Sequence, residues 1–148
     1  MRTLPFSAKA EYACIAMLEL ASRYSDTSPV RLKAIADAHG IPQRFLVQIL
    51  LQLKGSGLVV STRGAAGGYL LARAPKLISL ADILNILDRA DRPAGGRLND
   101  GGPPNPVVEA IRSVWKDVQA AQQRILEQTS LADLVTRSRE GHALVYQI

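Results

Sequence analysis

Apolar residues recur at helical spacing along the N-terminal half of the chain, where three helices are predicted. Residues 7–24 are apolar on nearly all sides, which indicates a helix buried on several faces, with Ser7 as its N-cap. Residues 32–39 predict a short helix that Gly40 ends. A third helix is expected from about Pro42, at its first helical position, to Ser56. Its apolar face is predicted to contain Phe45, Leu46, Ile49, Leu50 and Leu53.

A β-hairpin is predicted after these helices. Residues 58–62 and 69–72 are short, apolar and partly β-branched, and the glycine-rich loop RGAAGG separates them. A further helix is expected over residues 79–88, with Ser79 as its cap. Residues 90–106 are rich in proline, glycine, asparagine and aspartate and almost lack large apolar side chains. We therefore expect a flexible loop there.

The longest predicted helix covers residues 107–128 and carries a heptad seam. Apolar residues along it are spaced alternately by four and three positions, as in helices that pair with one another. A second apolar stripe, formed by Val108, Trp115 and Leu126, suggests that one face packs on the chain itself and another on a partner. The predicted dimerisation residues are Val107, Ile111, Val114, Val118 and Ile125, with Ala121 in the same seam.

These elements predict a mainly α fold with a small β-hairpin. We expect a winged helix-turn-helix domain over residues 1–76, a connecting helix over 77–89 and the flexible loop over 90–106. Residues 107–148 should form the dimerisation helix and a C-terminal part. Within that part, Ser130 is predicted to cap a short helix that is followed by an apolar tail without a pattern.

Residues 32–53 have the spacing of a helix-turn-helix. Ala36 is small where the two helices would cross, and Gly40 can adopt a turn conformation that other residues adopt at a cost. An ordinary pair of packed helices would share this spacing, but the hairpin that follows favours a winged helix-turn-helix, whose second helix enters the major groove. The predicted DNA-binding residues are Pro42, Gln43, Arg44 and Val47 of the helix and Ser61, Arg63, Gly64, Gly67 and Gly68 of the wing.

The glycine-rich loop fits neither phosphate-binding fingerprint of nucleotide-binding proteins. Dinucleotide folds need G-x-G-x-x-G leading into a helix, and P-loops need G-x-x-x-x-G-K-[ST]. The stretch RGAAGGY has neither spacing, lacks the lysine and leads into a predicted strand. As a wing, the loop would bring Arg63 to a phosphate or to the minor groove, and its glycines would let the backbone approach DNA. The structural alternative is a hairpin that needs glycine only for its own turn.

Positive charge is concentrated in the N-terminal half of the chain. The formal net charge is +5, and residues 1–76 contain ten Lys or Arg against four Asp or Glu. Residues 77–148 contain eight Lys or Arg against nine Asp or Glu. This uneven division of charge is typical of a nucleic-acid-binding module joined to a neutral one. No apolar run is long enough to span a membrane and no targeting segment is evident. We therefore expect a cytoplasmic protein with no membrane partner.

The sequence offers few residues for catalysis or metal binding. Cys14 is the single cysteine, and neither of the two histidines lies at ligand spacing from it. No Ser/His/Asp set and no carboxylate pair near a histidine is present, so we expect no enzyme, no metal and no cofactor. Cys14 is a possible redox switch, although a thiol in such an apolar helix is more commonly buried and inert.

The run GIPQRFLVQILLQLKGSGLVVSTRGAAGGYLLAR strongly resembles the recognition helix and wing of the bacterial winged-helix regulator family of IscR, NsrR and CymR. The likeness covers about residues 1–136, including SLADILNILD and SVWKDV. It implies a homodimeric transcription regulator, expected to be a repressor, that places two winged modules on a pseudo-palindromic DNA operator. The residues that match are Gly40, Ile41, Phe45, Leu46, Gln48, Leu53, Lys54, Gly57, Leu58, Ser61, Arg63, Gly64, Gly67, Gly68, Tyr69 and Leu71.

One departure from the family's pattern changes the expected sensing mechanism. Many members hold an iron–sulfur cluster through three cysteines in the loop before the long helix, whereas residues 90–106 contain no Cys, His or Glu. The chain therefore resembles the cluster-free branch. Val47 stands where iron–sulfur members often carry a glutamate that tunes base preference, so their operator sequence is not transferred. Two alternatives stay open: action through a partner enzyme or regulator, and a small-molecule effector between the winged module and the dimer helix.

Overall fold

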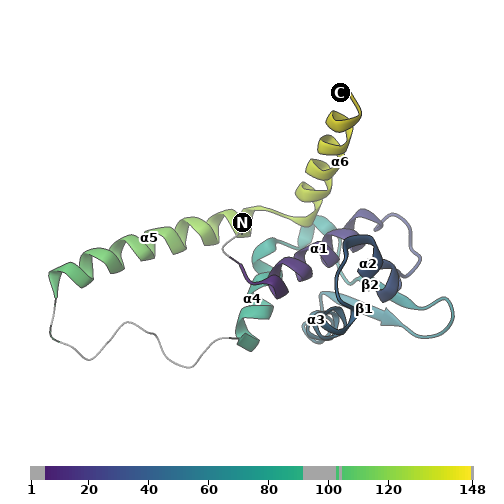
Figure 1. The fold of residues 1–148 in the computed structure, drawn as a ribbon, viewed down its shortest axis with the longest axis horizontal. Coiled ribbons are helices and arrows are strands. Elements are labelled where there is room, and N and C mark those ends of the chain that lie inside the picture. Colours follow the sequence, from purple (N-terminus) through teal and green to yellow (C-terminus); the bar gives the residue numbers. More distant parts are fainter. Residues whose placement is uncertain (1–5, 92–102, 104, 148) are drawn as a thin grey trace.

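The computed structural model describes residues 6–91, 103 and 105–147, and Figure 1 shows how their elements are arranged. This part of the chain is mostly helical, with one two-stranded antiparallel sheet, so the predicted fold class is confirmed. The elements are α1 (Ala8–Ser22), α2 (Leu32–His39), α3 (Gln43–Gly55), β1 (Val59–Thr62), β2 (Gly68–Leu71), the 3-10 turn η1 (Pro75–Leu77), α4 (Leu80–Asp91), α5 (Pro106–Gln128) and α6 (Leu131–Gln147).

Helix α1 lies at the centre of the core. It packs against α2, α3, α4, α6 and β2, which confirms the prediction that it is buried on several sides. Its N-terminus begins as expected, because the Ser7 hydroxyl accepts a hydrogen bond of 3.2 Å from the backbone N–H of Ala10. The side chains of α1 that are buried are Ala10, Ala13, Ala16, Met17, Leu20 and Ala21.

Helix α3 buries four of the five residues predicted for its apolar face, namely Leu46, Ile49, Leu50 and Leu53. The fifth prediction is wrong, because Phe45 is 50% exposed. Phe45 lies in the first turn at the edge of the buried stripe. Pro42 is also shifted from the predicted position. Its extended backbone (φ −59°, ψ 126°) makes it the N-cap, so that Gln43 is the first helical residue.

The two SLAD sequences each begin a helix with a reciprocal capping box. In α4, Asp82 Oδ2 accepts from the Ser79 backbone N–H at 3.0 Å, and Ser79 Oγ accepts from the Asp82 N–H at 3.1 Å. Ser130 and Asp133 repeat this arrangement in α6, and these hydrogen bonds lower the pKa of the Asp133 carboxyl. The two helix starts are joined by an antiparallel bridge between Ser79 and Ser130. The bridge joins the start of α4 to the start of α6, and α6 also packs directly on α1.

Three predictions about the C-terminal half are changed or fall outside the described residues. Helix α6 continues to Gln147 instead of ending near residue 140, since nothing after Gly141 interrupts the backbone hydrogen bonds as a proline would. Helix α4 extends to Asp91, three residues beyond its predicted end. The predicted flexible loop over 90–106 falls mostly outside the described residues. The turn η1 has no counterpart in the sequence prediction.

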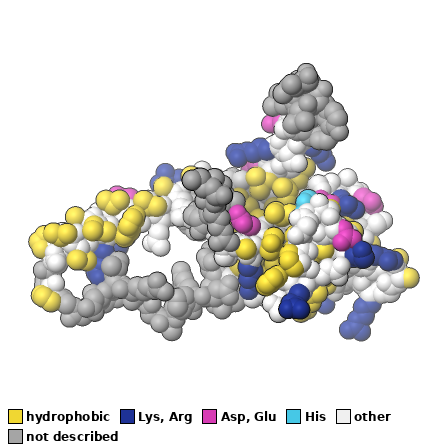
Figure 2. All heavy atoms as spheres, in the orientation of Figure 1, with side chains coloured by type: hydrophobic (Ala, Val, Ile, Leu, Met, Phe, Trp, Pro, Cys, Tyr) yellow, Lys and Arg dark blue, Asp and Glu magenta, His cyan; other side chains and the backbone are white. Residues whose placement is uncertain are grey.

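Helix α5 projects from the body of the molecule as an arm (Figure 1). None of its residues is buried, and it packs on its own chain through α4. Leu126, in the second predicted stripe, is partly buried against the core, whereas Trp115 of the same stripe is exposed. Hydrophobic side chains line the arm in Figure 2. The exposed apolar residues of α5 are Val107, Ile111, Val114, Trp115, Val118 and Ile125.

Candidate nucleic-acid interface

The turn between α2 and α3 has a left-handed backbone at one position. Gly40 adopts φ 63° and ψ 32°, as predicted for the residue that ends α2. The backbone N–H of Ile41 then donates to the carbonyl of Ala36 at 3.0 Å, which tightens the turn. Ile35, Ala36 and Ile41 are all buried, so the angle between the two helices is fixed by packing on both sides of the glycine.

The solvent-facing side of α3 carries a row of polar and apolar side chains. Pro42, Gln43, Arg44 and Val47, the predicted DNA-binding residues of this helix, are all exposed. Gln48, Leu51 and Lys54 continue the exposed face toward the C-terminal end of the helix. Because the opposite side of α3 is held in the core, this face is presented on a rigid element.

The predicted wing is present as an antiparallel hairpin. Strand β1 pairs with β2 in the register Val59↔Leu71 to Thr62↔Gly68. A third segment completes it, since the backbone N–H of Val30 donates to the Tyr69 carbonyl at 2.9 Å and the Tyr69 N–H donates to the Val30 carbonyl at 2.8 Å. The hairpin is therefore held on one edge by the segment that precedes α2.

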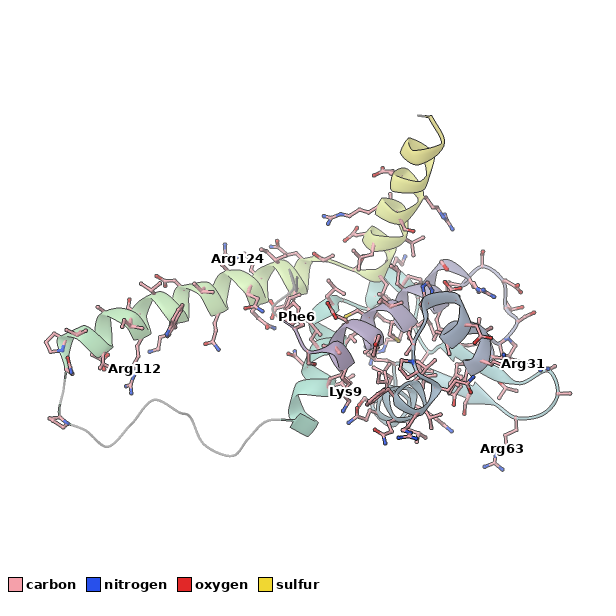
Figure 3. All side chains as sticks on the ribbon, in the orientation of Figure 1. Phe6, Lys9, Arg31, Arg63, Arg112 and Arg124 are labelled. Atoms are coloured by element: carbon pink, nitrogen blue, oxygen red, sulfur yellow. The ribbon has the colours of Figure 1, made fainter. Side chains whose placement is uncertain are left out.

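Arg31 supports the wing in a way that sequence analysis missed. Its guanidinium donates a hydrogen bond to the backbone carbonyl of Ala65 in the loop between the strands. Figure 3 shows Arg31 beside this loop. The two residues are 34 positions apart, and no periodicity relates them. The one available signal is that Arg31 stands directly before the predicted start of α2.

The wing glycines have different surroundings. A side chain at Gly67 would collide with the backbone carbonyl of Thr62, and Gly67 is buried. A Cβ at Gly68 would lie 2.5 Å from the Val30 carbonyl oxygen. Gly64 has open space around it. The requirement for glycine at 67 and 68 thus comes from the protein's own backbone, which is the alternative that the sequence left open for them.

Arg63 lies at the exposed end of the hairpin. Figure 3 shows its side chain extending away from the body, on the side of the molecule where α3 also lies. Ser61 and Gly64 beside it are exposed. In Figure 2, Lys and Arg side chains are spread along the lower edge of the body, the side toward which Arg63 extends. The exposed face of α3, with Arg44 and Lys54, and Arg63 at the wing tip therefore lie on the same side of the body.

The sequence and fold match one protein family across most of the chain. Residues 6–137 match the Rrf2 model, described as an iron-dependent transcriptional regulator. The chain belongs to the Rrf2 family of transcriptional regulators. Like the family, it is a DNA-binding regulator of the bacterial winged-helix type and not an enzyme.

Relatives and solved structures of the Rrf2 family agree with this assignment. A protein of Mycobacterium tuberculosis (strain H37Rv), named as an HTH-type transcriptional regulator, is 44% identical over 140 residues, covering 92% of this chain and 84% of its own. The structure of T. potens IscR is 33% identical with a TM-score of 0.75, covering 94% of this chain and 91% of its own. CymR, the global cysteine regulator of Bacillus subtilis, is 32% identical with a TM-score of 0.75, covering 91% and 98%.

Cys14 lies in α1 beside an apolar groove of about 380 Å³ that Phe6, Leu84 and Leu126 also line. Burial, with a smaller effect of the nearby Glu11 carboxylate, raises the pKa of its thiol to about 11. The reactive thiolate is therefore rare at neutral pH.

In the described part of the chain, no group of three or more His, Cys, Asp or Glu residues is placed to hold a metal ion. None of the described helices is long and apolar enough to cross a membrane.

Replacing Gly68 by alanine is expected to destabilise the winged module. The new methyl group would be forced against the Val30 carbonyl, which would weaken the pairing of the Val30 segment with β2. We expect the free energy of unfolding to fall by about 1–3 kcal/mol. Urea denaturation measures this change. Gly55→Ala, at a helical glycine with open space around it, is the control and should be neutral or stabilising. Equal stability of Gly68→Ala and the wild type would contradict the assigned role.

Proposed function

We propose that this Rrf2-family protein is a homodimeric repressor that binds a pseudo-palindromic DNA operator without a cysteine-ligated iron–sulfur cluster. The observation that carries the proposal is that the exposed face of α3 and Arg63 at the wing tip lie on the same side of the body. A recognition helix in the major groove and a wing on the neighbouring backbone or minor groove would use this surface. Because its ligand is chromosomal DNA, we place its action in the cytoplasm.

The proposed DNA contacts divide by chemistry. Gln43 and Arg44, at the N-terminal end of α3, have hydrogen-bonding groups for base edges or phosphates. Arg63 supplies a charge at the wing tip, where a narrow minor groove or a phosphate would attract it. Pro42, Ser61 and Gly64 are exposed and would approach the backbone of the duplex. Gly67 and Gly68 would act indirectly, by shaping the wing.

The exposed arm α5 supports the proposal of a homodimer. The seam predicted from the sequence is exposed along its whole length in a single chain, and burying it against a second copy would remove this apolar surface from water. A symmetric pair of helices would hold two winged modules at a fixed separation. A dimer held in this way over a promoter would block access of RNA polymerase, which is why we propose repression.

The donor chemistry of the chain does not fit an iron–sulfur cluster. Such clusters are held by cysteine thiolates, with histidine as a substitute in some, and this chain has one cysteine. Cys14 lies in α1, and its raised pKa disfavours the thiolate form. Residues 90–106 supply neither cysteine nor histidine. We therefore derive no sensing step through a cluster.

Replacing Arg63 by alanine is expected to weaken binding to the DNA upstream of the protein's own gene by about fivefold or more. One arginine contact to DNA contributes about 1–3 kcal/mol, and each lost phosphate contact lowers the salt dependence of binding by about one unit of slope. Fluorescence anisotropy at several KCl concentrations measures both quantities. Arg139→Ala is the matched control, since Arg139 is exposed on α6, which projects from the opposite side of the body. Unchanged binding by a folded Arg63→Ala variant would remove the wing contact from the proposal.

Replacing both Val114 and Val118 by glutamate is expected to convert the dimer to a monomer. Two carboxylates in an apolar seam must be desolvated or the seam must open, and either effect costs several kcal/mol. Sedimentation velocity measures the assembly state, and DNA affinity should fall with it because one half-site is lost. Ala120→Glu introduces the same group away from the seam on an exposed position and should stay dimeric. A dimeric Val114→Glu/Val118→Glu variant would refute the proposed interface.

A further inference from the structure

Two apolar side chains lie next to each other on the exposed face of the recognition helix. Val47 is 41% exposed and Leu51 is 57% exposed, and both belong to α3. Residues four positions apart lie on the same side of a helix, so the two side chains form one continuous apolar strip. The core does not use them, since the buried side of α3 is formed by Leu46, Ile49, Leu50 and Leu53.

Positive and polar groups surround this strip. Arg44 and Gln48 on one flank and Lys54 near the C-terminal end of α3 are all exposed. An apolar strip framed in this way suits a ligand that is negatively charged at its edges and carries apolar groups at its centre. The major groove of DNA has this character, because phosphates border it and thymine presents a 5-methyl group on its floor.

The chemistry of the two residues limits what they can read there. Valine and leucine have no side-chain donor or acceptor, so they cannot recognise the hydrogen-bonding edges of guanine, cytosine or adenine. Contact with an apolar group is the one favourable interaction that is open to them. Among the four bases, only thymine offers a methyl group in the major groove.

We propose that Val47 and Leu51 select thymine in each operator half-site by packing against its 5-methyl group. This inference rests on the proposed DNA-binding function and adds the base that this part of α3 recognises. Four helical residues rise about 6 Å, close to two base-pair steps of about 3.4 Å. The two recognised thymines are therefore within about two base pairs of each other, on one strand or on both.

Deoxyuridine substitution tests the inference directly, because it removes the 5-methyl group and keeps every hydrogen-bonding group of thymine. An operator is first selected from genomic fragments with the full-length protein, and each thymine is then replaced singly. Fluorescence anisotropy should show one or two positions in each half-site where affinity falls about fourfold, the effect expected for losing one buried methyl group.

Variants then assign the effect to the two side chains. In Val47→Ala or Leu51→Ala, the fourfold loss at the corresponding thymine should disappear, whereas Leu51→Met should retain it because methionine keeps an apolar tip. Leu77→Ala truncates an exposed leucine in η1, outside the proposed surface, and should leave the deoxyuridine pattern unchanged. Circular dichroism melting checks that each variant is folded.

The outcomes separate this inference from the function on which it rests. Wild-type protein that binds the operator but is indifferent to every deoxyuridine substitution would overturn the thymine contact and leave the regulator proposal intact. Sensitivity that persists unchanged in both alanine variants would assign the methyl contact to other residues and also overturn it. Failure of the wild-type protein to enrich any DNA would count against the proposed function itself.

Discussion

The close packing of helices on α1 is the constraint on which the rest of the structure depends. Four of the six buried residues of this helix are alanines, so neighbouring helices can approach its backbone closely. Helices α2, α3, α4 and α6 and strand β2 all contact it. The helix-turn-helix, the wing and the base of the C-terminal helices are thereby held on one support, and a larger residue at Ala13 or Ala16 would displace several of them together.

The same support explains how a short hairpin can act as a wing. Two isolated strands are marginally stable in water. Here a third segment, at Val30, pairs with β2, and Arg31 donates a hydrogen bond to the hairpin loop. Gly68 permits this pairing because it has no side chain, and any side chain there would collide with the Val30 carbonyl. Gly67 and Gly68 thus serve first to let the protein's own backbone segments approach one another. Arg63 remains the group that we propose the wing offers to DNA.

Local patterns predicted most of the secondary structure, because several helices have a capping residue or a terminating glycine and most have regular apolar spacing. Ser7, Gly40 and the two SLAD boxes mark helix ends where the structure has them. Predictions were wrong or incomplete where a result depended on distant residues or on which surface a neighbour covers. Phe45 has the spacing of a core residue, yet the described elements leave half of it exposed. The contact between Arg31 and Ala65, and the pairing of Val30 with Tyr69, depend on folding and leave no periodic signal. The DNA contacts and the α5 seam stay predictions, since both concern a second molecule.

The central claim is that α3 and the wing bind DNA as two symmetry-related copies, and hydroxyl-radical footprinting of a selected operator tests it most directly. Two winged modules on paired α5 helices should protect two stretches related by a dyad, with centres separated by a whole number of helical turns of about 10–10.5 base pairs each. Substituting Arg63 should shorten both stretches equally, at the edge where the wing lies. A single protected stretch, or two without dyad symmetry, would contradict the account.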